Sequence, residues 1–316
     1  MEFFDGLDAV PAAYGPSAVT IGKFDGVHTG HRAVLARLRD RARAHAYSGV
    51  VVTFDRNPLA VLAPERCPAA LVSNAQKQEL LAASGVDATL MLTFDRTLSL
   101  LTPEEFVGRV LVDGLGARLV LAGSDFRFGH RGAGDIGLLR RLGAELGFEV
   151  ELIDDVRGVG EGAARRASST WAREALEAGD VELAARVLGR PPAVRSVVVE
   201  GERRGRELGF PTANLDPARL EGFLPADGVY AAWATVDGVR HPSAVSIGNN
   251  PTFEGVPQHQ AEAHLLDVDL DLYGRTIELE FVARLRGMAR FDSLDALVAA
   301  IRADADSARR ALAVAG

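Results

Sequence analysis

The chain has 316 residues, 47% of them hydrophobic and 25% charged, so it holds enough apolar material for roughly two globular domains and is not a disordered protein. The formal net charge of -8 argues against non-specific binding of nucleic acid, and no apolar run approaches the roughly 18 residues of a membrane span. The single cysteine, Cys67, excludes an internal disulfide, and the acidic start MEFFDGLDAV lacks the basic segment of a signal peptide. We therefore expect a cytoplasmic protein without a nucleic-acid or membrane partner, and the sequence leaves its oligomeric state open.

The first half of the chain alternates between strand-like and helix-like segments. Short apolar runs that are typical of buried strands occur at residues 17–22, 49–54, 88–94, 118–123 and 148–153. Helical patterns occupy 31–46, 74–83, 101–111 and 137–147, and the third of them contains Thr102, Pro103 and Glu105 in the order of a capping box. This alternation, with continuously apolar strands, predicts a parallel sheet covered by helices on both faces.

The second half of the chain has a different period. Strand-like segments follow one another closely at 194–201, 228–236, 241–248, 260–267 and 276–285, and VDG at 236–238 is a tight hairpin signal. One amphipathic helix ends the chain, with Ser293 as its N-cap. The segments are those of an antiparallel barrel or sandwich, and we predict a small β-barrel with a C-terminal helix. The period changes near residue 188, so the predicted domains are 1–187 and 188–316.

The stretch GKFDGVHTGH, residues 22–31, lies between the first predicted strand and the first predicted helix. Ligands of open α/β sheets bind beyond the carboxyl ends of the strands, which is where this stretch falls. Gly22 and Gly26 allow a turn that approaches a ligand closely, and the helix N-terminus favours an anion. His28 and His31 are then able to share one face and to donate to phosphate oxygens.

Other interpretations of this region have less support. The two histidines alone are equally a structural pair, and a zinc site lacks a third and fourth ligand at a familiar spacing. A P-loop is excluded because Ser17 stands where glycine is required and Phe24 where serine or threonine is required. GAGDIG at 132–137 matches a dinucleotide fingerprint but lies well past the preceding strand. Since lysine occurs only at Lys23 and Lys77, phosphate contacts are expected mostly from arginine, histidine and backbone N–H groups.

GKFDGVHTGH resembles the HxGH signature of the nucleotidyltransferase superfamily, and its form GxFDGVHxGH resembles the FMN adenylyltransferase module of bacterial bifunctional riboflavin kinase/FAD synthetases. Three further segments match that module in order: TFDRNP (53–58), AGSDFRFGHRGAGD (122–135) and ASSTWAREAL (167–176). The resemblance implies a Rossmann-like nucleotidyltransferase fold. It also implies a reaction in which FMN and ATP give FAD and pyrophosphate.

The resemblance assigns roles to residues of the first half. It makes His28, His31 and Arg173 catalytic, and the residues that it places at the nucleotide or its phosphates are Gly22, Phe24, Asp25, Gly26, Asn57, Asp125, Arg127, Ser169 and Thr170. Arg127 is either a phosphate ligand or a brace for its loop, and Ser169 and Thr170 either bind phosphate, cap the following helix, or do both. Trp171 stands where some family members carry a polar or basic residue, which would weaken one phosphate contact.

GERRGRELGFPTANL, residues 201–215, resembles the riboflavin kinase module of the same family. Gly201, Gly205, Arg206 and Pro211 belong to a glycine-rich loop that is able to fold over phosphates. Within it, the Thr212 hydroxyl and the Asn214 carbonyl oxygen are the hard ligands that Mg²⁺ takes together with ATP phosphates. As isolated residues, both would be ordinary turn formers.

The resemblance continues to the C-terminal helix and implies that riboflavin and ATP give FMN and ADP. It makes Glu262 the base beside the ribityl hydroxyl. His264 lies two residues further along the same strand face and is expected to be a packed or bracing residue and not a catalytic one. Arg286 is expected to contact flavin, although Met288 and Ala289 stand where an acidic group is common. The expected ligands are thus riboflavin, FMN, FAD, ATP and Mg²⁺.

Two alternatives remain open. One is a chain with a single active module, a riboflavin kinase with an impaired adenylyltransferase. The other is a non-catalytic flavin-binding protein. The presence of two phosphate-handling motifs favours the bifunctional enzyme over both. A cytidylyltransferase would share HxGH but would leave PTAN unexplained.

Overall fold

The computed structural model describes residues 1–153, 165–201, 209–248, 260–268 and 270–315, which fall into two compact units. The first unit comprises residues 1–70 and 74–167, and the second comprises residues 71–73 and 168–316. A parallel sheet forms the first unit and an antiparallel barrel forms the second, as the sequence predicts. In the part of the chain that is described, no helix is long and apolar enough to cross a membrane.

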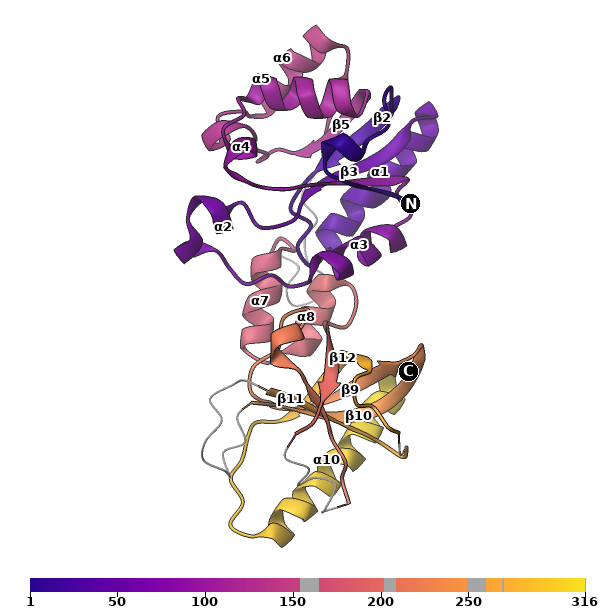
Figure 1. The fold of residues 1–316 in the computed structure, drawn as a ribbon, viewed down its shortest axis with the longest axis vertical. Coiled ribbons are helices and arrows are strands. Elements are labelled where there is room, and N and C mark those ends of the chain that lie inside the picture. The colour runs from indigo at the N-terminus through magenta and orange to yellow at the C-terminus, as the bar shows by residue number, and fades with distance from the viewer. Residues whose placement is uncertain (154–164, 202–208, 249–259, 269, 316) are drawn as a thin grey trace. The chain divides into compact units, whose positions relative to one another are not determined.

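The first unit is built on a six-stranded parallel sheet (Figure 1). Its strands are β1 (Glu2–Asp5), β2 (Ser17–Ile21), β3 (Ser48–Phe54), β4 (Ala88–Leu92), β5 (Ala117–Gly123) and β6 (Glu149–Ile153). Their order across the sheet is β1-β4-β3-β2-β5-β6. β3 and β4 therefore lie on one side of β2, and β5 and β6 lie on its other side. The carboxyl ends of β2 and β5 therefore form the topological switch point, where open α/β sheets bind ligands.

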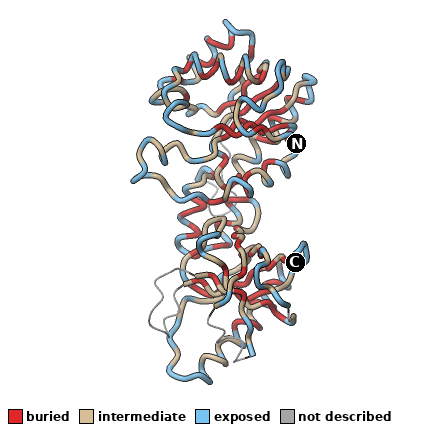
Figure 2. Tube along the Cα trace, viewed as in Figure 1, coloured by how far each residue is buried: buried red, intermediate tan, exposed pale blue. Residues whose placement is uncertain are grey.

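Helices cover both faces of this sheet. They are α1 (Thr29–His45), α2 (Leu59–Leu62), α3 (Asn74–Ala83), α4 (Arg96–Ser99), α5 (Pro103–Phe106) and α6 (Ile136–Leu146). Because side chains of a strand alternate between faces, Val50 and Val52 of β3 join a core with Val110 and Leu139. Val51 joins a second core with α1 and α3. The central strands are accordingly buried (Figure 2).

Two elements of this unit differ from the sequence-based expectation. β1 is an edge strand of four residues that pairs with β4, and so short a segment gives little periodicity to detect. The capping box at Thr102 and Glu105 is present as predicted, but the helix that it opens continues from Val107 to Gly114 as a π-helix. An apolar pattern predicts that such a segment is helical, but it does not distinguish i→i+5 from i→i+4 hydrogen bonding.

The second unit is a closed barrel of six strands. They are β7 (Ala193–Val199), β8 (Ala213–Leu215), β9 (Gly228–Val236), β10 (Val239–Gly248), β11 (Gln260–Leu265) and β12 (Thr276–Arg286). Their order around the barrel is β10-β11-β8-β7-β12-β9, with antiparallel pairing throughout. Closure removes the exposed sheet edges that a sandwich would retain. The sequence leaves β8 unpredicted, since three residues are too few for an alternating pattern.

In the described part of the second unit, the α-helices are α7 (Ser169–Glu177), α8 (Val181–Leu188) and α10 (Leu294–Ala315). Residues of α7 and α8, among them Leu176 and Val187, share the core of the barrel. The N-terminus of α10 is capped by Ser293, as predicted, whose Oγ accepts the N–H of Ala296 at 3.2 Å. The main stretch of the compact second unit thus begins at Ser168, about twenty residues before the change of sequence period.

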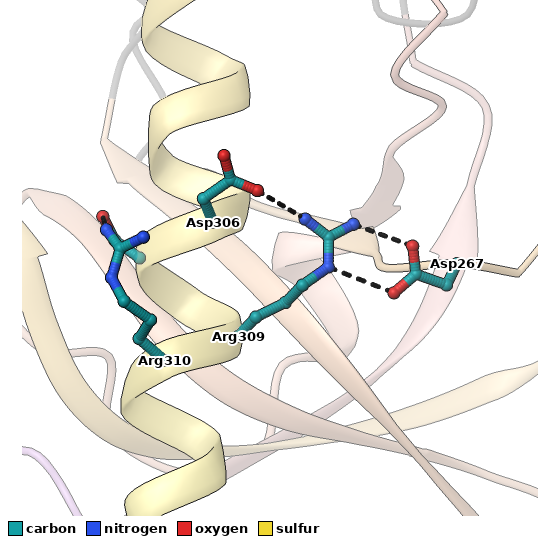
Figure 3. A network of polar contacts seen from close by, with 5 residues as sticks. Asp267, Asp306, Arg309 and Arg310 are labelled. Atoms are coloured by element: carbon teal, nitrogen blue, oxygen red, sulfur yellow. Dashed lines mark hydrogen bonds and ion pairs between the residues drawn. The ribbon is translucent and has the colours of Figure 1, made fainter.

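An ion-pair network holds α10 to the loop after β11. The Arg309 guanidinium lies 2.7 Å from Asp267 through Nη2 and 2.8 Å from Asp306 through Nη1 (Figure 3). Arg310, on the next position of the helix, donates to Ser307. All these side chains are substantially exposed, so each pair contributes only a fraction of a kcal/mol, and the apolar contacts of Ala308 and Leu312 carry most of the attachment.

Candidate active sites

The loop after β2 brings His28 and His31 into ring contact. His28 is the N-cap of α1, where its Nδ1 accepts the backbone N–H of His31 at 3.3 Å. Since Nδ1 acts as the acceptor, a neutral His28 carries its proton on Nε2, which is therefore a donor. The two rings stack with centroids 3.6 Å apart, and the ring of Phe24 lies 4.8 Å from that of His31. The loop thus presents two imidazoles in one stack at a helix N-terminus.

His31 has the chemistry of a neutral donor to a ligand. Burial is the main cause that holds its pKa well below 6.5, and the charges of His28, Arg166 and Lys77 lower it further. Its Nδ1 is buried and has no hydrogen-bond partner among the described residues. A buried polar atom of this kind is costly unless something binds it, so the arrangement fits an anionic ligand that completes the site.

The pKa of His31 also predicts how stability depends on pH. We expect the free energy of unfolding of the unligated protein to fall as the pH drops below about 6.5, because the unfolded chain then binds a proton that folded His31 rejects. His31→Gln, which does not titrate, should make this dependence shallower. Urea unfolding of both proteins between about pH 7.5 and about pH 5.5 measures it. Equal slopes for the two proteins would contradict the assignment.

The loop that carries the histidines is strained. Phe24, Gly26 and Val27 have positive φ angles of 49°, 77° and 40°. For the two residues other than glycine this conformation costs about 1–3 kcal/mol each, and it is retained because both side chains are buried. Gly30 allows a close approach, since a Cβ there would lie 3.1 Å from the His28 ring and the ring would have to shift. Backbone strain of this kind is a feature of binding loops.

The ends of β3 and β5 bring Asn57, Asp125 and Arg127 to the same edge of the sheet as the histidines. The side chain of Asn57 caps α2, its Oδ1 accepting the N–H of Leu59 at 3.1 Å. Asp125 forms an ion pair of 2.7 Å with Arg166. Both side chains of this pair are about half exposed, so this is not a buried ion pair. A ligand is therefore able to compete for either member.

Arg127 is exposed and makes one long ion pair, 3.8 Å from Asp135. Its neighbours Phe126 and Phe128 stack at 5.4 Å, and Phe128 is buried against Gly134. The bracing of this loop therefore comes from the two rings and not from the arginine. This leaves the guanidinium of Arg127 accessible to an anion.

The residues of the segment ASSTWAREAL lie on α7, in the second unit. Ser168 is the N-cap, with its Oγ accepting the N–H of Trp171 at 3.2 Å. The capping role considered for Ser169 and Thr170 therefore belongs to Ser168, one residue earlier. Arg173 is buried on the same helix, and Trp171 packs into the hydrophobic core.

The barrel gathers the residues of the second predicted site on neighbouring strands. Glu262 of β11 lies directly opposite Asn214 of β8, and the Oγ1 of Thr212 lies 3.5 Å from the Glu262 carboxylate. Asn214 donates through Nδ2 to the carbonyl oxygen of Thr212 at 3.4 Å, which leaves its Oδ1 as the side-chain acceptor. The alternate residues of both strands are buried, so these three polar side chains share the opposite face.

Other residues hold this cluster in place. A Cβ on Gly201 would lie 2.5 Å from the Asn214 side chain, so only glycine allows that approach. A ring nitrogen of His264, Nδ1, lies 2.8 Å from the carbonyl oxygen of Pro211, which fastens the PTAN segment to β11 and agrees with the bracing role predicted for His264. Gly205 and Arg206 lie outside the described residues.

Comparison with known proteins decides the family. A FAD synthetase model matches residues 11–170, and a riboflavin kinase model matches residues 188–312. A bifunctional riboflavin kinase/FMN adenylyltransferase from Pseudomonas fluorescens is 41% identical over 98% of this chain and 97% of its own. The chain belongs to the bifunctional riboflavin kinase/FMN adenylyltransferase family. It is a transferase with both activities, which together make FMN and FAD.

Further relatives support this assignment. The bifunctional enzyme of Escherichia coli K12 is 41% identical over 92% of this chain and 91% of its own. A solved structure described as a macrolide-efflux protein from Streptococcus pneumoniae aligns with a TM-score of 0.86 and 30% identity over 97% of this chain and 98% of that one. Both units of this chain therefore have counterparts in that solved chain.

Arg286, the residue predicted to contact flavin, forms a bidentate ion pair in this family member. Its Nε and Nη2 lie 2.9 and 2.8 Å from the two carboxylate oxygens of Asp304 on α10. The guanidinium also lies over the ring of Phe291 at 5.6 Å. These contacts fix the end of β12 to the C-terminal helix and leave only part of the guanidinium for a ligand.

The pair between Arg286 and Asp304 predicts a stability effect. Asp304→Asn should lower the free energy of unfolding of the second unit by about 1–3 kcal/mol, because a half-buried guanidinium loses its charged partner. Asp306→Asn is the matched control, since Asp306 is exposed on the same helix and its pair with Arg309 should contribute less than about 1 kcal/mol. Urea unfolding of the two variants measures the difference. Equal effects would show that Asp304 is not the anchor.

The structure adds three residues that the sequence does not single out. Ser246 of β10 lies directly opposite Glu262, and its hydroxyl contacts the sulfur of Met288 at 3.9 Å. Arg166 adjoins Asp125, and its charge acts on His31. Lys77 is buried near the carboxyl end of β3. Only Arg166 had a sequence signal, since it lies directly before the segment ASSTWAREAL.

Proposed function

We propose that the two reactions are divided between the predicted domains, 188–316 for phosphorylation of riboflavin and 1–187 for adenylylation of FMN. One observation carries this proposal: the two family models match separate stretches, and each stretch holds one of the two polar clusters. The cluster within 188–316 consists of Thr212, Asn214 and Glu262, and the cluster within 1–187 is the loop 22–31.

In the barrel, the Glu262 carboxylate is the base for the ribityl hydroxyl of riboflavin. Phosphoryl transfer has a loose transition state, so the position of the attacking oxygen matters more than full removal of its proton. Glu262 is held for this task by its place between Asn214 and Ser246 on the neighbouring strands. The ribityl oxygen attacks the γ-phosphorus of ATP, ADP leaves, and the carboxylate receives the hydroxyl proton.

In the first domain, the FMN phosphate attacks the α-phosphorus of ATP, and pyrophosphate leaves. The attacking oxygen is already anionic, so the protein needs no base and no covalent intermediate. Its task is to overcome the repulsion between two polyanions and to align them. His28 and His31 supply imidazole donors, and the N-terminus of α1 supplies backbone N–H groups. The resemblance of the sequence assigns to Arg173 a positive charge for the triphosphate. Asp125 and Asn57 are assigned to the nucleotide.

Mg²⁺ is part of the proposal for both reactions. The described residues hold no cluster of three or more histidine, cysteine or acidic side chains that would bind a metal alone. Mg²⁺ does not need such a cluster, because it is commonly held by one or two protein oxygens together with substrate phosphates. Thr212 and Asn214 would supply those oxygens in the barrel, and the ion would neutralise charge on the phosphates.

Product analysis tests the proposal. Riboflavin, ATP and Mg²⁺ are expected to yield FMN first and FAD later, and FMN with ATP and Mg²⁺ is expected to yield FAD and pyrophosphate. Chromatography of the flavins with time separates the steps. FMN that accumulates without FAD would mean a single active module, and unchanged riboflavin with unchanged FMN would mean a flavin-binding protein. Omission of Mg²⁺ should stop both steps.

A further inference from the structure

Thr53 is a buried polar residue that the reaction described above does not use. It lies one residue before the end of β3, in an otherwise apolar run, and it is fully buried. Its Oγ1 donates to the carbonyl oxygen of Lys23 at 3.1 Å. Burial of a hydroxyl is unfavourable unless the hydroxyl is hydrogen-bonded, and valine would have the same shape without this cost. The bond to Lys23 therefore explains why the strand carries threonine here.

A second buried threonine of the sheet makes a bond of a different kind. Thr20 of β2 donates through Oγ1 to the carbonyl oxygen of Leu121 at 3.0 Å. Thr20 and Leu121 lie opposite each other on the paired strands β2 and β5, so this bond joins two elements of the sheet. The bond of Thr53 leaves the sheet, because its acceptor Lys23 belongs to the loop 22–31. Thr53 therefore connects the sheet to the loop that carries the histidines.

The peptide that Thr53 holds lies at the first positive φ angle of this loop. The carbonyl group of Lys23 and the N–H group of Phe24 belong to one planar peptide unit. A fixed carbonyl therefore restrains the φ angle of Phe24, which is 49°. A conformation of this kind persists only when its surroundings enforce it. The β-branched side chain of Thr53 has few rotamers, so its hydroxyl is a fixed donor that contributes to this enforcement.

Phe24 connects the restrained peptide to the histidines. Its ring is buried and lies 4.8 Å from the ring of His31, which in turn stacks on the ring of His28 at 3.6 Å. A rotation of the peptide before Phe24 would move this ring and so the surface against which His31 packs. The position of the imidazole stack therefore depends on a contact that is made from β3.

We infer that Thr53 is a positioning residue of the adenylylation reaction: its hydroxyl fixes the peptide between Lys23 and Phe24 and thereby places the Phe24 ring against which His31 is held. This inference rests on the proposed function of the first domain. A purely structural hydroxyl would stabilise the sheet, as that of Thr20 does, without affecting how the loop binds ATP.

Three variants test the inference. Thr53→Val keeps the shape of the side chain and removes its donor, so it should lower kcat/KM for FMN adenylylation by about 10–100-fold and raise KM for ATP. Thr20→Val is the matched control, because it removes a buried hydroxyl bond of similar length from the same sheet, and it should change kcat/KM far less. Thr53→Ser retains the hydroxyl and should keep most of the activity.

The KM for ATP separates a loss of position from a loss of stability. A variant that is partly unfolded has fewer active molecules, so its apparent kcat falls while its KM stays unchanged. Urea unfolding measures how much stability each variant loses. The NMR signals of the His31 imidazole in the unligated protein are a second readout, and they should shift in Thr53→Val but not in Thr20→Val. If Thr53→Val does not fold, Thr53→Ser and Thr53→Ala, which differ by one hydroxyl group, provide the same comparison.

Two results would overturn the inference. One is an equal loss of adenylylation in Thr53→Val and Thr20→Val, compared per folded molecule. The other is a Thr53→Ser protein that is no more active than Thr53→Ala. The wild-type protein separates the two proposals: if it makes no FAD from FMN, the proposed function of the first domain fails. If it makes FAD and the threonine variants behave alike, only the role of Thr53 is wrong.

Discussion

Replacement of both His28 and His31 by alanine is expected to lower kcat/KM for FMN adenylylation by roughly 10²–10⁴-fold and to leave riboflavin phosphorylation unchanged. The two imidazoles lie in one stack at the N-terminus of α1, and His31 has a buried Nδ1 without a partner among the described residues. Removing both takes away the side-chain donors that offset the repulsion between FMN and ATP. Separate assays with FMN and with riboflavin as the flavin substrate measure the two effects.

His28 also caps α1, so a loss of stability must be separated from a loss of binding. Replacing an N-cap by alanine costs about 0.5–2 kcal/mol. His28→Asn is the appropriate second variant, because asparagine accepts the same backbone N–H but lacks the donor that Nε2 provides. It should retain stability and lose adenylylation. His45→Ala, at the other end of the same helix, is the control for a general effect on α1. Equal loss of both reactions in the histidine variants would contradict the division into two sites.

The sequence predicts the elements of the first domain well because they repeat simple patterns. The helix over 74–83 and the capping box at Thr102 are present where the apolar spacing and the turn chemistry place them. β1 and β8 are missed because four and three residues carry too little pattern. β8 matters most, since it is the strand that carries Asn214.

The arrangement of the sites depends on topology, which no local pattern contains. Motifs predict that His28 and His31 act together, but not that His28 lies outside the helix and that the rings stack. Lys77 is twenty-three residues from Phe54 in sequence, and it reaches the site only because α3 returns to the carboxyl end of β3. The partner of Arg286 is likewise invisible in sequence, because it lies on a helix that packs against the barrel.

The barrel site makes the second large prediction. Glu262→Ala should lower the rate of riboflavin phosphorylation by roughly 10²–10⁴-fold, the range for removal of a general base, and should leave the adenylylation of supplied FMN unchanged. Glu262 is the carboxylate of the cluster with Thr212 and Asn214. The measurement is the initial rate of each half-reaction with saturating ATP.

Glu262→Gln distinguishes a base from a positioning group. Glutamine keeps the size of the side chain and a contact with Thr212, but it cannot accept a proton. If Glu262 is the base, Glu262→Gln should lose nearly as much kcat as Glu262→Ala while its KM for riboflavin stays close to that of the wild type. If the carboxylate only orients Thr212, glutamine should restore most of kcat. Ser246→Ala is the matched control from the strand opposite Glu262: it removes a neighbouring hydroxyl but no charge, so it should reduce kcat far less than either change at Glu262.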